Sequence, residues 1–282
     1  MKIVKFLGGL GNQMFQYAFY LSLSNKQSNV KADVSDFETY ELHNGLELEK
    51  VFNIKLNKAS LFSIKIFNPF YRTWIFRKLR RILNLKKAYF TEKTPFFFDS
   101  EALNSSKSKM YWGYWQHLGY FEQISEQIKQ DFSFKSPLKN ENLAISNLIT
   151  TTESVSIHVR RGDYVGHSLL GGICDSNFYE NAIQIIKHQV SAPTFFVFSN
   201  DINWCKENIK VKNVHYISWN QNENSYIDMQ LMSMCKHNII ANSSFSWWGA
   251  WLNPNKHKIV VSPKRWTNDS KDTLALDEWI KC

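Results

Sequence analysis

The chain has 282 residues, 44% of them hydrophobic, which is enough for a substantial core in one large domain or two small ones. No stretch holds the roughly 18 unbroken apolar residues that span a bilayer, and Asn12, Gln13 and Gln16 interrupt the N-terminal apolar run, so no signal peptide is expected. The net charge of +9 comes from one segment, because residues 50–91 hold 11 Lys or Arg and no acidic residue, whereas the rest of the chain holds 23 basic and 25 acidic residues.

The chain is predicted to open with a strand over residues 1–7, followed by a turn with glycines at positions 8, 9 and 11 and a helix from about Asn12. Glycines let backbone N–H groups approach a ligand closely, and a helix N-terminus favours phosphate. The turn is not a dinucleotide-binding fingerprint, because Met14 stands where the third glycine would be. A ligand-binding turn and a helix-capping turn both fit. A second strand is predicted over residues 29–34.

Residues 70–87 are predicted to form a helix with two different sides. Its apolar residues lie roughly on one side: Trp74, Ile75, Leu79, Ile82, Leu83 and Leu85. Its basic residues lie on the other: Arg72, Arg77, Lys78, Arg80, Arg81, Lys86 and Lys87. A basic amphipathic helix is typical of attachment to an anionic membrane surface, and a solvated helix packed on its own lobe fits slightly better. No nucleic-acid-binding motif accompanies it, so nucleic acid is not an expected partner.

Aromatic rings are dense over residues 110–121, and the polar residues 139–142 come before the next regular pattern. We therefore predict two lobes. The N-terminal lobe would be residues 1–150, including the basic segment 50–91, and the C-terminal lobe would be residues 151–282. The four cysteines show neither metal-ligand nor redox spacing: Cys174, Cys205, Cys235 and Cys282. They are expected to be reduced thiols in a cytoplasmic protein, and peripheral attachment to the inner face of the plasma membrane is an alternative.

Strands and helices are predicted to alternate from residue 155 to the C-terminus. The predicted strands are residues 155–159, 194–199, 214–217, 239–241 and 259–262. The predicted helices are residues 177–189, 202–209, 226–234 and 246–252. This alternation predicts a parallel, Rossmann-like sheet, in which ligands gather at the carboxyl ends of the strands.

The stretch from Ser156 to Val165 is the strongest candidate for a functional site. An apolar strand ends there in a turn that carries Arg160, Arg161 and Asp163. Guanidinium groups match phosphate oxygens two at a time and stay charged, so two of them in one turn fit a diphosphate. Arg161 and Asp163 are expected to brace each other. From these residues alone, a surface ion-pair cluster is the alternative interpretation.

Polar residues also follow two later strands, namely Asn200 after the second and Ser243 after the fourth. Ser243 and Ser244 precede a helix, where hydroxyl and N–H groups form a phosphate cup or an N-cap. Asp228 lies at the start of the predicted helix over residues 226–234. A carboxylate there could also serve only to interact with the helix dipole.

Three motifs together resemble one enzyme family. They are His-Val-Arg-Arg-Gly-Asp-Tyr-Val at 158–165, Gly-Gly-Leu-Gly-Asn-Gln-Met-Phe-Gln-Tyr-Ala at 8–18, and Asn-Ser-Ser-Phe-Ser-Trp-Trp-Gly-Ala-Trp-Leu at 242–252. In order and content they resemble the α-1,2-fucosyltransferases of glycosyltransferase family 11. The resemblance implies an α/β fold of the GT-B type, with two Rossmann-like lobes facing a central cleft. It also implies transfer of L-fucose from GDP-β-L-fucose to the 2-hydroxyl of a terminal β-galactoside, in surface polysaccharide or O-antigen synthesis.

The same resemblance assigns roles to individual residues. Arg160 would bind the departing diphosphate, Arg161 would hold the loop, and Asp163 would be the partner of Arg161. The remaining donor-binding residues would be Gly9, Asn12 and Gln13 near the fucose and diphosphate, His158, Asp228 at the guanine edge, and Ser243, Ser244 and Phe245 at the β-phosphate and base. The acceptor-side candidates are Trp115, Gln116 and His167.

No Asp-x-Asp sequence occurs, so we expect transfer without a metal or other cofactor, with the diphosphate charge met by Arg160 and backbone donors. Inversion at the anomeric carbon implies direct attack by the acceptor hydroxyl, helped by a general base. Asp163 and His167 are both candidates for this base. Two other functions fit the sequence. One is transfer from another GDP-sugar, such as GDP-mannose. The other is a non-catalytic basic protein that binds anionic membranes or nucleic acid through residues 50–91.

Overall fold

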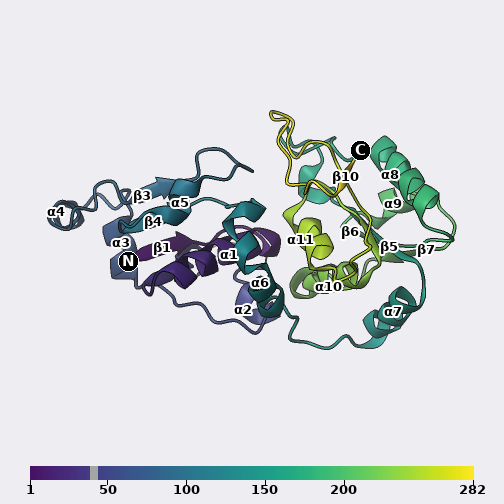
Figure 1. The fold of residues 1–282 in the computed structure, drawn as a ribbon, viewed down its shortest axis with the longest axis horizontal. Helices are drawn as coiled ribbons and strands as arrows, with labels where there is room; N and C mark the ends of the chain where they lie inside the picture. The colour runs from purple at the N-terminus through teal and green to yellow at the C-terminus, as the bar shows by residue number, and fades with distance from the viewer. Residues whose placement is uncertain (39–43) are drawn as a thin grey trace. The chain divides into compact units, whose positions relative to one another are not determined.

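The computed structural model describes residues 1–38 and 44–282 of the chain. It forms two compact α/β units, Met1–Lys135 and Ser136–Cys282 (Figure 1). The division falls earlier than the predicted boundary at residue 150, because helix α7 (Asn140–Thr151) packs on elements of the second unit. The residues of α7 therefore belong to the C-terminal lobe.

A four-stranded parallel sheet forms the centre of the first unit, with the strand order β2-β1-β4-β3. Its strands are β1 (Lys2–Lys5), β2 (Val30–Asp33), β3 (Tyr89–Thr91) and β4 (Lys109–Trp112). The helices are α1 (Leu10–Lys26), α2 (Leu48–Val51), α3 (Leu61–Phe67), α4 (Trp74–Ile82), α5 (Ser100–Asn104) and α6 (Ser125–Asp131). The predicted opening strand, glycine turn and first helix are confirmed.

The two faces of this sheet carry different residues because side chains alternate along a strand. Ile3 and Met110 pack with Ile64 and Phe67 of α3 in one apolar cluster. On the other face the rings form a separate cluster around Phe19 of α1: Tyr111, Trp115 and Tyr120. Much of the aromatic-rich stretch 110–121 therefore builds a core.

Lys2 is a charged residue within that core. Its side chain is fully buried, its ammonium lies 5.7 Å from the centre of the Tyr111 ring, and its Nζ atom has no hydrogen-bond partner among the described residues. Burial, and secondarily the charge of Lys26, lowers the pKa of Lys2 from 10.5 to about 8. Because the unfolded chain binds this proton more tightly, the wild-type protein gains stability as the pH rises from about 8 to about 10.5.

Replacing Lys2 with methionine should therefore stabilise the protein by about 1–3 kcal/mol at neutral pH, since the thioether fills similar space without a charge. Chemical denaturation at pH 7 and pH 10 measures the effect, and the gain should shrink at the higher pH. Lys107→Met, at an exposed position of the same unit, is the matched control and should change little. A destabilised Lys2→Met protein would contradict the prediction.

The second unit contains a six-stranded parallel sheet with the order β10-β9-β8-β5-β6-β7. Its strands are β5 (Ser154–Val159), β6 (Thr194–Ser199), β7 (Val214–Ile217), β8 (His237–Ile239), β9 (Val260–Ser262) and β10 (Ile280–Lys281). Its helices after α7 are α8 (Ser176–Gln189), α9 (Ile202–Asn208), α10 (Tyr226–Met234) and α11 (Ser244–Leu252). Figure 1 shows α8 and α9 on one side of the sheet and α10 and α11 on the other.

The predicted alternation of strands and helices in this unit is confirmed. Strands β6 and β7 and helix α10 have the predicted bounds, whereas β8 begins and ends two residues earlier than predicted. The apolar cluster under α8 and α9 includes Val155, Ile157 and Val159 of β5. The alternate residues Ser156 and His158 therefore face the side of α10 and α11.

The basic segment differs from its prediction. The predicted helix over residues 70–87 is limited to α4, because Asn84 adopts a left-handed conformation (φ 54°) and the N–H groups of Asn84 and Leu85 cap the carbonyls of Arg81 and Arg80. The division into an apolar and a basic side is also wrong, since Trp74 is exposed and Arg80 is buried. Within the described residues, no helix is long and apolar enough to cross a membrane.

Candidate active site

The arginine turn lies at the carboxyl end of β5, one of the two central strands of the second sheet. A single turn of 3-10 helix, Gly162–Tyr164, follows the two arginines. The N–H of Arg161 donates to Oδ1 of Asn200 at 3.2 Å, and a Cβ atom on Gly162 would lie only 2.1 Å from Nδ2 of the same side chain. Any larger residue here would require the Asn200 side chain to move, so the amide after β6 and the turn after β5 fit against each other.

The two arginines have different partners from those predicted. Arg160 Nη2 lies 2.8 Å from Asp163 Oδ1, whereas Arg161 Nε donates to Asp201 Oδ2 at 3.0 Å and its guanidinium lies 4.5 Å from the centre of the Trp204 ring. The predicted Arg161–Asp163 brace is therefore wrong. It fails because β5 ends at Val159 and the turn brings Asp163 back to Arg160.

The position of the Asp201 carboxylate, which pairs with Arg161, is fixed by the start of helix α9. It is the N-cap of α9 and accepts a hydrogen bond from the N–H of Trp204 at 3.1 Å. That hydrogen bond and the Arg161 guanidinium lower the pKa of Asp201, so its carboxylate stays charged. Arg161 is consequently held by α9, while Arg160 has a more exposed partner, since the Asp163 side chain is 55% exposed.

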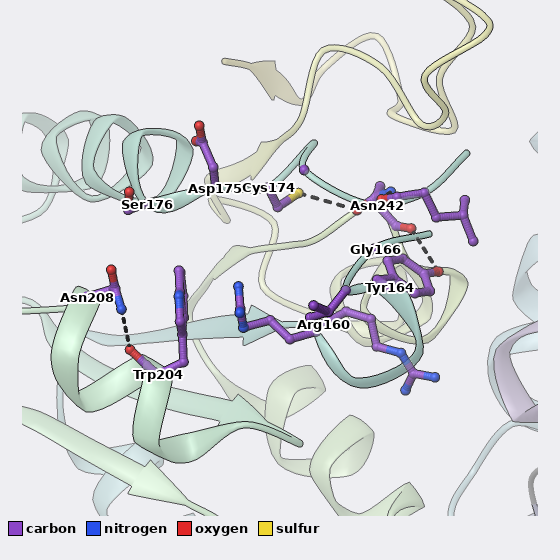
Figure 2. Close-up of a pocket in the computed structure, with 13 residues that line it drawn as sticks. Arg160, Tyr164, Gly166, Cys174, Asp175, Ser176, Trp204, Asn208 and Asn242 are labelled. Atoms are coloured by element: carbon purple, nitrogen blue, oxygen red, sulfur yellow. Dashed lines mark hydrogen bonds between the residues drawn. The ribbon is translucent and has the colours of Figure 1, made fainter. Parts of the chain in front are cut away.

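Both arginines line a cavity of about 310 Å³ in the second unit (Figure 2). Its walls come from the arginine turn, the loop before α8, helix α9 and the segment that follows β8. The residues that line it include Arg160, Arg161, Tyr164, Cys174, Trp204 and Asn242. The Arg160 guanidinium also lies 5.5 Å from the centre of the Tyr164 ring, a cation–π contact that stabilises its positive charge.

Asn242 fastens the cavity wall, a role that the sequence analysis missed. Its buried side chain donates from Nδ2 to the carbonyls of Leu170 and Trp266, both at 3.1 Å, and accepts from the Cys174 thiol at 3.5 Å. Its own carbonyl accepts from the Tyr164 hydroxyl at 3.3 Å. Figure 2 shows the last two of these contacts. The available signal was its position as the first residue of the motif at 242–252.

His158 and Phe245 lie together on the α11 side of the sheet. Their ring centres are 5.7 Å apart, and burial, with the Arg160 charge as a second cause, lowers the pKa of His158 to about 3. The imidazole is therefore neutral at physiological pH, and its buried Nδ1 has no hydrogen-bond partner among the described residues. Ser243 is the N-cap of α11, with no capping hydrogen bond from its side chain, and Ser244 begins the helix.

Asp228 lies in the first turn of α10, as predicted, and is held by a network of asparagines. Its Oδ1 accepts from Asn220 Nδ2 at 2.7 Å, and Asn220 exchanges two further hydrogen bonds with Asn142 of α7, at 2.8 and 2.9 Å. Burial raises the pKa of Asp228 to about 7, against the lowering effect of Asn220. The carboxyl group can therefore exchange a proton near neutral pH.

The candidates in the first unit are grouped at the glycine turn. Gly9 is the N-cap of α1, and Asn12 lies in its first turn with Oδ1 accepting from Gln116 Nε2 at 2.7 Å. Gly8 has a φ of 79°, and a Cβ atom there would lie 2.8 Å from Asn12 Nδ2. Glycine 8 and Gln116 thus set the position of the Asn12 amide.

Two sequence-predicted roles do not match the structure, those of Gln13 and Trp115, whereas that of His167 stays a prediction. Gln13 is fully buried and joins the carbonyls of Gly8 and Gly45 to the N–H of Glu47, so it shapes loops and does not face a donor. Trp115 is fully buried and stacked on Phe19 at 4.3 Å, so it is wrong as an acceptor-lining residue. His167 is exposed, and its Nδ1 accepts from the N–H groups of Leu169 and Leu170.

Across residues 1–38 and 44–282, no three His, Cys, Asp or Glu side chains come close enough to hold a metal ion. All four cysteines lie within these ranges and are free thiols.

The fold is shared with a solved structure. The NodZ α-1,6-fucosyltransferase co-crystallised with GDP matches 88% of this chain and 91% of its own, with a TM-score of 0.53 and 13% sequence identity. The likeness confirms the predicted fold class, an α/β protein of the GT-B type with two Rossmann-like lobes.

The family follows from sequence comparison. The model of glycosyl transferase family 11 matches residues 1–282, and the chain belongs to that family. Two Escherichia coli proteins are similar over most of their length. An alpha-1,2-colitosyltransferase is 36% identical over 94% of this chain and 91% of its own, and the O-antigen biosynthesis glycosyltransferase WbnK is 35% identical over 97% of each. Human galactoside alpha-(1,2)-fucosyltransferase 1 is 29% identical over 47% of this chain and 40% of its own.

Proposed function

We propose that this glycosyltransferase moves L-fucose from GDP-β-L-fucose to the 2-hydroxyl of a terminal β-galactoside, with inversion and without a metal ion. The observation that carries the proposal is Arg160 at the rim of the β5 cavity, in a chain that matches family 11 along its whole length. The fucosyl donor and galactoside acceptor are supported by the similarity to the human enzyme, and GDP by its presence in the NodZ crystals. Similarity to WbnK supports a role in O-antigen biosynthesis.

In the proposed reaction, the oxygen of the acceptor 2-hydroxyl attacks the anomeric carbon of fucose from the face opposite the nucleotide. The bond from that carbon to the β-phosphate oxygen breaks, and GDP leaves with the electron pair. The hydroxyl proton passes to a general base. Arg160 stabilises the charge that grows on the diphosphate as the bond breaks, because its guanidinium is already oriented by Asp163 and Tyr164.

The nucleotide is assigned to the same unit as Arg160. Asp228 would accept the N1 and N2 hydrogens of guanine, which adenine does not offer. Ser243, Ser244 and Phe245 would hold the β-phosphate and base at the start of α11, where N–H groups favour an anion. The unpartnered Nδ1 of neutral His158, beside Phe245, would supply one further polar contact.

A second donor is favoured by one observation. The 36% identity with an alpha-1,2-colitosyltransferase extends over nearly the whole chain. Colitose is L-fucose without its 3-hydroxyl group, so the two sugars differ by a single oxygen atom. A site that hydrogen-bonds the 3-hydroxyl would prefer fucose, and an apolar site would accept colitose.

The test is a transfer assay with the purified chain, EDTA and lactose, in which GDP-fucose and GDP-colitose are supplied separately. We expect GDP release that depends on lactose, and an α-1,2 linkage between fucose and galactose in the product by NMR. Faster transfer of colitose would replace the proposed donor while keeping the class of reaction. Activity that appears only after magnesium or manganese is added would overturn the metal-independent mechanism.

A further inference from the structure

An exposed surface of the first unit combines apolar and cationic side chains. It is formed by α3, the turn at residues 68–73 and α4, which Figure 1 shows at one end of that unit. We name it the α4 surface. Its exposed apolar residues are Leu61, Phe62, Phe70, Trp74, Ile75, Ile82 and Leu83. Its exposed basic residues are Arg72, Arg77, Lys78 and Arg81.

The exposed apolar residues of α4 lie on a different side of the helix from the residues that pack against the core. Phe76, Leu79 and Arg80 form the inner side of the helix, where Phe76 and Leu79 pack on the cluster that contains Ile3. Trp74, Lys78 and Ile82 follow at intervals of four residues and therefore share the outer side. Trp74 is 73% exposed and Ile82 is 66% exposed. The outer side thus has its own apolar character while the inner side is already packed.

Arg80 holds the α4 surface in a defined shape. Its buried guanidinium donates to the carbonyls of Lys65 at 3.1 Å, Asn68 at 2.9 Å and Tyr71 at 2.6 Å, with a longer contact to Ile66. These bonds tie the end of α3 and the following turn to α4. The exposed ring of Phe70 is held at the edge of this turn by an edge-to-face contact with Tyr89. The α4 surface therefore has a defined structure in the unbound protein.

The charge around this surface indicates the chemistry of its partner. Residues 50–91 hold 11 basic and no acidic residues, so the cations of the α4 surface have no carboxylate within the segment to neutralise them. An anionic partner would complement them. Exposed Trp, Phe, Ile and Leu among the cations favour a partner that also takes apolar groups. A bilayer with anionic headgroups offers both, because cations remain at the headgroups while rings and aliphatic chains enter the interface.

We propose that the α4 surface docks this protein on an anionic lipid bilayer. A polyanion such as nucleic acid fits less well, since its phosphates would leave the exposed isoleucines and leucines without a partner. The attachment is peripheral, with a short helix lying in the plane of the headgroups. This inference rests on residues outside the cavity and does not depend on the proposed reaction.

The experiment is co-sedimentation of the full chain with vesicles of phosphatidylcholine alone, or of phosphatidylcholine and phosphatidylglycerol in equal parts. We expect binding to the anionic vesicles only, weakening as salt is added. The variant Arg77→Gln/Lys78→Gln/Arg81→Gln should lower the partition coefficient roughly a hundredfold. Trp74→Ser/Ile82→Ser should lower it roughly tenfold and should do so at high salt as well. Arg80 is left unchanged because it holds the turn.

The matched control is Lys206→Gln/Lys210→Gln/Lys212→Gln, which removes the same charge from exposed positions of the second unit. It should bind vesicles like the wild type, and all variants should keep the wild-type thermal unfolding temperature. If this control lost as much vesicle binding as the Arg77/Lys78/Arg81 variant, the proposal would be overturned, because net charge alone would then explain the binding. Absence of binding to anionic vesicles would overturn it as well. So would tighter binding to a single-stranded oligonucleotide that is lost in the α4 variants.

Discussion

Replacing Arg160 with alanine should lower kcat for sugar transfer by about a hundred- to a thousandfold, which is the usual cost of removing one donor that stabilises developing charge. The reason is positional. Arg160 follows the last residue of β5, lines the cavity and is held by Asp163 and Tyr164. Because the guanidinium acts on charge that appears only as the bond breaks, KM for the acceptor should change much less than kcat. Steady-state kinetics with varied lactose measure both quantities.

Three comparisons make this result specific. Arg81→Ala removes the same charge from an exposed position of α4 and should leave turnover of a soluble acceptor unchanged. Arg160→Lys keeps the charge without the planar fork and should retain only part of the activity. Asp163→Asn distinguishes two roles of Asp163. If Asp163 only orients Arg160, the variant should keep the wild-type dependence of kcat on pH. If Asp163 is the general base, that dependence should be lost. Wild-type kcat in Arg160→Ala would refute the assigned role.

Affinity for GDP-fucose should rise about tenfold between pH 6 and pH 8 if Asp228 accepts hydrogen bonds from guanine. The pKa of this carboxyl is raised to about 7 in the ligand-free protein, and only the ionised form can accept both hydrogens. GDP-fucose is the better ligand for the measurement because its diphosphate lacks the terminal phosphate proton of GDP, which titrates at about pH 6. Isothermal titration calorimetry across this range gives the affinity.

The matched variant is Asp228→Asn. It should bind GDP-fucose about a hundredfold more weakly than the wild type at pH 8, since charge-assisted hydrogen bonds to the base are lost, and it should show no pH dependence near neutrality. The ligand-free wild-type protein should also lose stability as the pH rises from about 4 to about 7, because the folded state binds the Asp228 proton more tightly than the unfolded state. A pH-independent affinity in the wild type would exclude Asp228 as the guanine contact.

Much of the second unit was predictable because its signals are local. The strands of buried apolar residues and the amphipathic helices between them have characteristic periods, and β6, β7 and α10 matched their predicted bounds. The site at the carboxyl end of β5 was predictable for the same reason, since it required only the order of strands and the two arginines. The first unit was harder, because residues 70–87 have a helical pattern that does not reveal where Asn84 ends the helix.

The sequence by itself determined the class of fold, the motifs of the family and the turn that carries Arg160, because each depends on residues that are close together in the chain. Only the tertiary structure decided that Arg161 pairs with Asp201 and not with Asp163, that Gln13 and Trp115 are buried, and that Asn242 joins the walls of the cavity. The physical reason is that ion pairing, burial and pKa depend on groups from distant segments that surround a side chain. The order of residues along the chain does not show which of these groups become neighbours, because the sheet brings them together only in the folded protein.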